Sequence, residues 1–227
     1  MNVYFISGLG ADRRVFKYIR VPEGFTIHYV EWAAPGKDET LADYALRLTE
    51  QIDITQPFIL VGLSLGGIMA VEIAKKFAPV ATILISSIPV SARMPRYFYL
   101  GRSLRLIDIL PISFFKRAAL MKRVFSPETS DDKELVRQLI RDSDAGFMRW
   151  AMRAVLKWKN DYIPQPLWQI HGGRDLIFPV RLAKPNTASP SRLISGAGHL
   201  LVMTHAQEVN ALLQEVLSLP VQGKSGF

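Results

Sequence analysis

Ser64 is the side chain best placed to act as a nucleophile. It stands at the centre of Gly62-Leu63-Ser64-Leu65-Gly66, a G-x-S-x-G pattern between an expected strand and an expected helix. Glycines on both sides permit a tight, strained turn that projects the serine hydroxyl from the end of a sheet. The chain has no cysteine, so a thiolate nucleophile and a cysteine-ligated metal are excluded. The pattern alone is weak, and its surroundings must decide its meaning.

A serine hydroxyl needs a base to take its proton, and the base needs a third group to fix its tautomer. His199 is the best placed of the four histidines, because it follows Ser195-Gly196-Ala197-Gly198, a loop directly after the last expected strand. His28 lies within an expected strand, and His205 lies within the last expected helix. His171 closes a strand, and we expect the following turn to carry the chain away from it.

An orienting acid must lie in a loop at the same edge of the sheet. Asp175 meets this requirement because it follows the strand that ends at His171, whereas no carboxylate directly follows the strand that ends at Ser86. Nucleophile, acid and base then occur in the order Ser, Asp, His, which other serine hydrolase folds do not share. Two backbone N–H groups must also bind a developing oxyanion, and those of Leu9 and Leu65 fit this role.

Strand and helix patterns alternate along most of the chain. Short apolar runs rich in β-forming residues predict six strands, at residues 3–7, 26–30, 58–61, 80–86, 167–171 and 192–195. Apolar residues at helical spacing predict helices over 41–52, 68–77 and 209–217, and a further helix is expected after the first strand. The alternation indicates an α/β fold with a mainly parallel, doubly wound sheet, in which ligands bind at the carboxyl ends of the strands.

Residues 91–163 interrupt this alternation, because they contain helical patterns and no convincing strand. We interpret them as a helical cap inserted into a single domain of residues 1–227, a length typical of one domain. In the last helix of this cap, residues 145–158, aromatic side chains lie on one side and basic side chains on another. The tail, residues 222–227, is expected to be frayed.

Four short motifs resemble the landmarks of the α/β-hydrolase family. They are Ser7-Gly8-Leu9-Gly10, Gly62-Leu63-Ser64-Leu65-Gly66, His171-Gly172-Gly173-Arg174-Asp175 and Gly196-Ala197-Gly198-His199. Each is weak alone, but four in the right order are specific. The resemblance implies a mainly parallel sheet with a cap inserted after the strand near Ser86, and an esterase, lipase, thioesterase or related hydrolase.

Two departures from the family's pattern bear on this expectation. Ser7 stands where many members have a histidine before the oxyanion glycine, which changes how the oxyanion loop is supported. The chain also starts at what would be the family's third strand, so we expect a sheet that is reduced at its N-terminal side.

The motifs together predict a serine hydrolase that cleaves a small-molecule carboxylic ester or thioester through an acyl-enzyme. We expect it to use no cofactor and no metal. Leu9, Leu65, Met148 and Met152 are candidates for an apolar substrate pocket, although the two methionines fit the core equally well.

Two alternatives stay open at this point. The first is a non-enzymatic small-molecule receptor on the same fold, because fold does not fix function. The second is a dinucleotide-binding protein, suggested by Gly8, Gly10 and Glu31, although Arg13 occupies the position of the third glycine.

The positive charge of the chain lies in one segment. The net charge is +8, and residues 93–159 hold 15 of the 28 Lys and Arg residues but only 7 of the 20 Asp and Glu residues. This segment suggests an anionic substrate or peripheral contact with a membrane surface, although an ordinary solvated surface explains it as well. We expect no nucleic-acid partner, because charge is the only argument for one.

The sequence also bounds the location of the protein. No apolar run reaches the length of about 20 residues that a membrane-spanning helix needs. The N-terminus lacks the basic region and the cleavage site of a secretion signal, so a cytoplasmic location is the default expectation. Nothing in the sequence indicates an oligomeric state.

Overall fold

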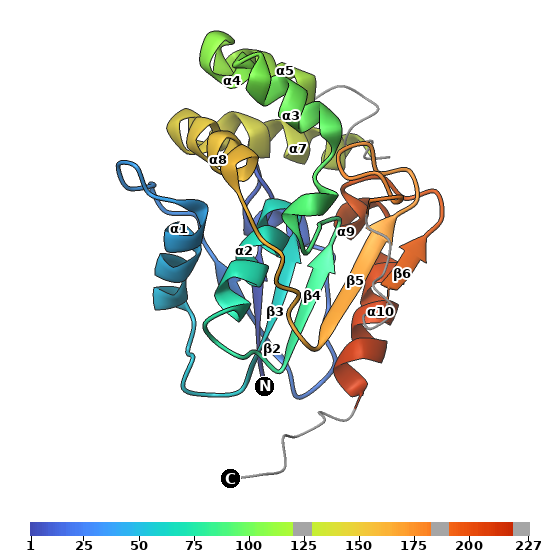
Figure 1. Ribbon diagram of the computed structural model, residues 1–227. Coiled ribbons are helices and arrows are strands. Elements are labelled where there is room, and N and C mark those ends of the chain that lie inside the picture. Colours follow the sequence, from blue (N-terminus) through green and yellow to red (C-terminus); the bar gives the residue numbers. More distant parts are fainter. Residues whose placement is uncertain (120–128, 183–190, 220–227) are drawn as a thin grey trace.

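Six parallel strands form the centre of the fold (Figure 1). The computed structural model describes residues 1–119, 129–182 and 191–219, so the expectation for the tail at 222–227 lies outside the described residues. The strand order is β2-β1-β3-β4-β5-β6, and all neighbours are parallel. The strands are β1 (Asn2–Ile6), β2 (Thr26–Val30), β3 (Phe58–Leu63), β4 (Ala81–Ile85), β5 (Leu167–Gly172) and β6 (Ser191–Ile194). Their positions confirm the predicted parallel sheet.

Alternate side chains of the central strands are buried on opposite faces of the sheet. In β1, Val3 and Phe5 pack into one apolar cluster, whereas Tyr4 and Ile6 pack into another. All residues of β3 are buried. A strand that is buried on both faces has no solvent side, which explains why its sequence is apolar throughout and not alternating.

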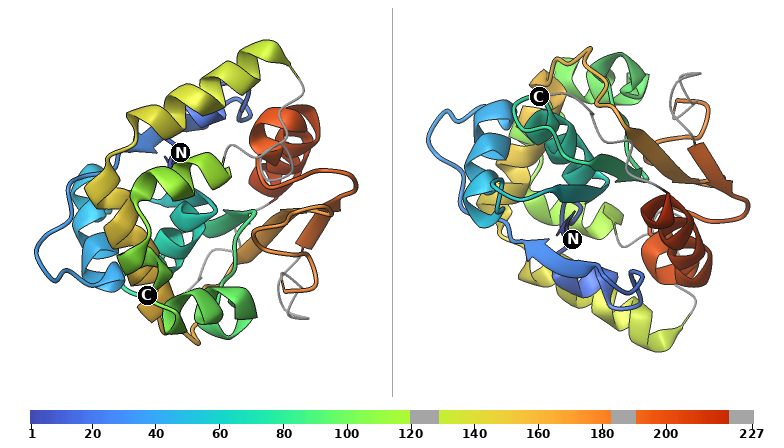
Figure 2. Two further views of the ribbon diagram at one scale, coloured as in Figure 1. Left: turned by 90° about the horizontal axis from the view of Figure 1, so that it is seen from above. Right: turned by 90° about the horizontal axis from the view of Figure 1, so that it is seen from below.

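Helices cover both faces of the sheet. The helices α1 (Leu41–Arg47) and α2 (Leu65–Ala74) pack on one face, and α9 (Leu201–Thr204) and α10 (Ala206–Ser218) pack on the other (Figure 2). The helix predicted over 41–52 continues beyond α1 only as a 3-10 turn, η2 (Leu48–Gln51). The two-sided arrangement confirms the doubly wound fold.

The helix predicted after the first strand is absent from the described residues between β1 and β2. A single 3-10 turn, η1 (Arg13–Phe16), takes its place, and the side chain of Asp12 caps it. Val15 and Phe16 are buried in the core. The helix prediction was wrong because the apolar side chains here anchor a loop, which turns back to the start of β2 through Pro22 and Gly24.

Residues 91–163, hereafter the helical segment, lie over the carboxyl ends of the strands (Figure 1). The part that the structure describes contains a 3-10 turn, five α-helices and no strand. These elements are η3 (Ser91–Arg93), α3 (Arg96–Ser103), α4 (Leu106–Ile109), α5 (Ile112–Ala119), α7 (Ser130–Asp142) and α8 (Ala145–Lys157). Across the described residues, no helix combines the length and the apolar character needed to cross a membrane.

The two ends of the helical segment meet where it joins the sheet. The N–H of Ser91 donates to the carbonyl of Asn160 at 2.9 Å, and the N–H of Asn160 donates to Oγ of Ser91 at 3.0 Å. The buried Nδ2 of Asn160 also donates to the carbonyl of Pro89 at 2.7 Å. Close by, Nε1 of Trp158 donates to Oε1 of Glu72 on α2 at 2.7 Å. These bonds fix the base of the segment to the sheet and its helices.

Candidate active site

Ser64 sits on a strained turn between β3 and α2. Its φ of 53° and ψ of −116° lie outside the regions that residues with a Cβ usually adopt. A Cβ on Gly62 would lie 2.3 Å from the carbonyl oxygen of Gly66, and one on Gly66 would lie 2.1 Å from the carbonyl oxygen of Ile6. The two glycines of the motif are therefore required by close approach of the backbone.

His199 lies between Ser64 and Asp175. Its Nε2 is 2.9 Å from Oγ of Ser64, and its Nδ1 is 2.8 Å from Oδ2 of Asp175. His199 and Asp175 are each only 3% exposed, so water competes little for these contacts. The loops after β3, β5 and β6 thus bring the three side chains selected from the sequence within hydrogen-bonding distance, and their catalytic roles stay predictions.

Both carboxylate oxygens of Asp175 accept hydrogen bonds. Oδ1 accepts the backbone N–H groups of Ile177 at 2.8 Å and Phe178 at 2.9 Å, while Oδ2 faces His199. Burial alone raises the pKa of Asp175, but the charge and hydrogen bond of His199, helped by His171 and the N–H of Phe178, outweigh it and hold the pKa below its usual value. Asp175 is therefore an ionised acceptor that fixes the orientation of the imidazole.

His171 is a second imidazole beside the acid. We expected the turn after β5 to carry the chain away from His171, and this was wrong: the turn brings Oδ2 of Asp175 to 3.4 Å from its Nε2. The same Nε2 donates to the carbonyl of Phe178 at 2.6 Å, so it carries the proton. Burial lowers the pKa of His171, although Asp175 and the Phe178 carbonyl oppose this effect. His171 is thus neutral and contacts the acid, whereas His199 contacts the serine.

The loop after β1 runs beside the serine. A Cβ on Gly8 would lie 3.3 Å from Cβ of Ser64, so the backbone that leads into Leu9 passes next to the nucleophile. Leu65 is the first residue of α2, and the first N–H groups of a helix have no acceptor within it. Leu9 and Leu65 line the same cavity as Ser64, and the use of their N–H groups as oxyanion donors stays a prediction.

Ser7, at the position where the resemblance implied a histidine, supports this loop. Its hydroxyl donates to the carbonyl of Ala11 at 2.9 Å, and Nε1 of Trp32 donates to the same carbonyl at 3.0 Å. The N–H of Ala11 donates to the carbonyl of Gly8 at 3.1 Å, which closes the turn. The loop is therefore held by a hydroxyl and an indole.

A model of the alpha/beta hydrolase family matches residues 3–212. The chain belongs to the α/β-hydrolase family. The matched range contains the serine turn, the acid and both histidines described above. No curated protein matches the sequence significantly.

Solved structures share the fold of this α/β-hydrolase at low sequence identity. A thermophilic esterase from Thermogutta terrifontis is 22% identical, with a TM-score of 0.75 over 96% of this chain and 89% of that chain. The esterase EaEST from Exiguobacterium antarcticum is 16% identical, with a TM-score of 0.76 over 98% and 92%. A bromoperoxidase from Bacillus anthracis is 17% identical, with a TM-score of 0.69 over 93% and 90%. At these identities the likeness shows the fold alone.

A cavity of about 580 Å³ separates the sheet of the α/β-hydrolase from its helical segment. Ser64 and His199 lie in its wall, and so do all four apolar residues selected from the sequence. The lining from the loops and α2 includes Gly8, Leu9, Leu65 and Phe178, and the lining from the helical segment includes Phe98, Leu139, Met148 and Met152. The cavity of this family member therefore presents a mainly apolar surface beside the serine.

Sequence reasoning missed Tyr97, which joins α3 to the loop of the acid. Its hydroxyl donates to the carbonyls of Leu176, at 3.0 Å, and Ile177. Burial and the nearby charge of Asp175 raise the pKa of Tyr97 to about 12, so the hydroxyl remains a donor near neutral pH. His171 was also missed as a partner of the acid, and only its position four residues before Asp175 pointed to the contact.

His28 and His205 are not among the residues that line this cavity of the α/β-hydrolase, whereas Gly8 and Gly10 of the dinucleotide motif are. His28 is on the edge strand β2, and His205 lies at the junction of α9 and α10, not inside the last helix as expected. Gly10 is followed by the four-residue turn η1 and not by an α-helix, so a pyrophosphate would lack the helix N-terminus that the dinucleotide motif requires. Glu31 pairs with Arg13 at 3.7 Å.

Proposed function

We propose that the protein is a serine hydrolase that cleaves a carboxylic ester or thioester through an acyl-enzyme. The observation that carries the proposal is the pair of contacts through His199, from Ser64 Oγ on one side to Asp175 Oδ2 on the other. A hydroxyl, an imidazole and a carboxylate in this arrangement form a nucleophile, a base and an orienting acid.

In the proposed first step, Oγ of Ser64 attacks the substrate's carbonyl carbon while Nε2 of His199 takes the hydroxyl proton. The carbonyl oxygen becomes an oxyanion and accepts hydrogen bonds from the N–H groups of Leu9 and Leu65. Asp175 accepts a hydrogen bond from Nδ1–H of His199, which holds the imidazole in the tautomer in which Nε2 carries no proton and can take that of Ser64. Ionised Asp175 also stabilises the imidazolium that results.

In the second step, the tetrahedral intermediate collapses and expels an alcohol or thiol, which takes the proton from Nε2 of His199. A water molecule then attacks the acyl-enzyme, again with His199 as base, and releases the carboxylic acid and free Ser64. We further propose that the helical segment acts as the cap of a single domain of residues 1–227, because the cavity beside Ser64 lies between this segment and the sheet.

A fluorophosphonate probe tests the proposal directly, because it reacts covalently with an activated serine and not with an ordinary hydroxyl. We expect one label per chain at Ser64, no label in Ser64→Ala, and normal labelling in the control Ser130→Ala, which changes an exposed serine on α7. A screen of p-nitrophenyl esters and acyl-CoA thioesters then separates the two substrate classes. An unlabelled Ser64 together with no turnover of either class would leave the receptor alternative.

A further inference from the structure

Apart from Ser64, His199 and Tyr97, the described residues that line the cavity beside Ser64 are apolar or glycine. Among the described residues that line it there is no Asp, Glu, Lys or Arg. Met148 and Met152 stand one turn apart on the cavity side of α8, and methionine adapts its shape to a flexible apolar ligand. Burying a charged group against such a wall is costly, because nothing there replaces its water.

None of the basic side chains that the structure describes in the helical segment lines this cavity. The guanidinium of Arg149 donates to the carbonyls of Ile107 and Leu110, which ties α8 to α4. Nε of Arg153 donates to Oδ1 of Asp108 at 2.7 Å. These two cations of α8 bond to neighbouring parts of the segment, and the described wall of the cavity offers no cation to an anionic substrate.

The two ends of the cavity differ in exposure. Tyr97 and Leu176 line it and are 49% and 53% exposed, so the cavity meets solvent beside the loop of the acid. Leu139, Ile140 and Met148 line it at the side of the oxyanion loop, and all three are buried. Met148 approaches that loop closely, since its Cε would lie 3.8 Å from a Cβ on Gly10.

The chemistry assigns one part of the substrate to each end. The leaving alcohol or thiol must take its proton from Nε2 of His199, and Phe178, in the loop that leads from Leu176, lies against that ring with centroids 6.1 Å apart. The leaving group therefore faces the open end. The acyl chain, which remains bound to Ser64 after the first step, extends into the buried end.

We propose that this buried end binds an uncharged, flexible aliphatic acyl chain; the inference rests on the proposed ester or thioester hydrolysis. The cavity of about 580 Å³ holds on the order of 20 water-sized groups at about 30 Å³ each, and part of it must take the carbonyl and leaving group. The acyl chain therefore has roughly 8 to 12 carbons.

A series of p-nitrophenyl esters from acetate to hexadecanoate tests the length. We expect kcat/KM to rise about fourfold per added methylene at first, to pass a maximum between octanoate and dodecanoate, and to fall beyond it. The mono-p-nitrophenyl ester of sebacic acid, which carries a carboxylate at the far end of a ten-carbon chain, should react on the order of 100-fold more slowly than the decanoate ester. A maximum at acetate, or equal rates for the two ten-carbon esters, overturns the proposal.

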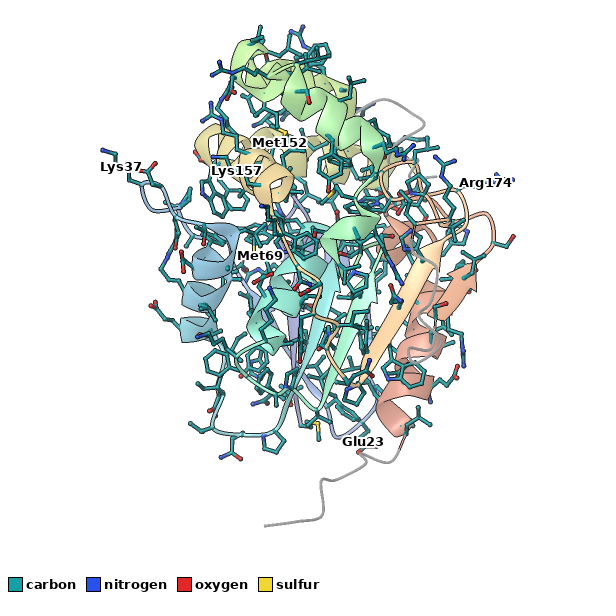
Figure 3. The ribbon with its side chains drawn as sticks, viewed as in Figure 1. Glu23, Lys37, Met69, Met152, Lys157 and Arg174 are labelled. Carbon is teal, nitrogen blue, oxygen red and sulfur yellow. The ribbon has the colours of Figure 1, made fainter. Side chains whose placement is uncertain are left out.

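Substitutions on α8 test the position of the chain (Figure 3). Met152→Trp fills part of the cavity, and we expect the maximum to move to shorter esters by roughly two to four carbons. Lys157→Trp places the same side chain at an exposed position of α8 outside the lining, and it should leave the maximum unchanged. Val155→Phe fills the same region if Met152→Trp fails to fold. An unchanged maximum in a folded cavity variant contradicts the proposal.

Binding to Ser64→Ala separates this inference from the proposed function. Calorimetry with decanoic acid and with sebacic acid needs no turnover. Micromolar binding of decanoic acid, and at least tenfold weaker binding of sebacic acid, supports the apolar site even if no ester is hydrolysed. If neither acid binds, the inference fails, while labelling of Ser64 by a fluorophosphonate still decides the proposed function.

Discussion

The loops at the carboxyl ends of the strands and the helices of the helical segment face each other across one cavity, and different interactions hold them in place. At the sheet edge, backbone atoms approach so closely that a Cβ on Gly66 would lie 2.1 Å from a carbonyl oxygen. In the helical segment, a Cβ on Gly101 would meet only the end of the Leu106 side chain, at 3.9 Å. Long side chains such as Arg149 tie these helices together from outside the cavity.

This difference separates two tasks. The sheet edge holds Ser64, His199 and Asp175 through backbone geometry that tolerates little change. The helical segment supplies wall residues such as Met152, which can change in size while the helices keep their contacts. We therefore expect substitutions at the sheet edge to affect the rate of reaction, and substitutions in the helical segment to affect which substrate reacts.

Asp175→Asn should give the largest effect. An amide can hydrogen-bond to the imidazole, but it favours the wrong tautomer and cannot stabilise the imidazolium, so we expect kcat to fall by roughly 10⁴-fold. KM and the chain-length profile should change little, because Asn occupies the same space. Asp161→Asn, an exposed carboxylate in the same part of the chain, is the control. A loss of only twofold would remove Asp175 from its proposed role.

Gly66→Ala and Gly101→Ala make the same change in the two regions and should have opposite effects on stability. At Gly66 the new Cβ collides with the backbone at the end of β1. We expect the free energy of unfolding to fall by more than about 3 kcal/mol, which lowers Tm by roughly 6 °C or more. At Gly101, inside α3, alanine is the better helix former and should stabilise by up to about 1 kcal/mol. Equal losses of Tm by calorimetry would contradict the comparison.

His171→Gln should change how stability depends on pH. The pKa of His171 is lower in the folded protein, so below its ordinary pKa near 6.5 the unfolded chain binds a proton that the folded protein rejects. Stability from this group is complete above that pH and is lost as the pH falls. Without the imidazole, the decrease in Tm between pH 7.5 and 5.5 should be smaller than in the wild type. His28→Gln is the control, and an identical decrease in both variants would contradict the assignment.

Arg153→Met should have the smallest effect. Its partner Asp108 lies on the surface, and an exposed ion pair contributes little. We expect kcat/KM for the decanoate ester to change by less than about twofold in low salt, and by less still in 0.5 M salt. A loss of tenfold would mean that this cation reaches the substrate.

The parallel sheet and the proximity of Ser64 to Asp175 and His199 could be predicted from the sequence. Apolar runs and their order define a parallel sheet, and loops that follow parallel strands end at one edge, so Ser64, Asp175 and His199 had to lie near one another. The contact of His171 with Asp175 depends on how tightly one turn folds back, which residue types alone do not determine.

Other features depended on packing between distant parts of the chain. Val15, Phe16 and Ile19 have the spacing of a helix, but their side chains anchor a loop to the core. The bond from Tyr97 to the loop of the acid depends on the direction in which α3 crosses the sheet edge. No local sequence pattern in this polar and aromatic helix indicates that direction.

The hydrogen bonds between Ser91 and Asn160 have a consequence for how the chain can vary. They bring the start and the finish of about seventy residues together, so the connection from β4 to β5 spans a short gap whatever its length. Lengthening a connection whose two ends are already held together adds little to the entropic cost of folding. Relatives with larger, smaller or differently shaped segments between these positions could therefore keep the same strands in the same order. We expect a graft made between Ser91 and Asn160 to transfer substrate preference while leaving the sheet edge that carries Ser64 unchanged.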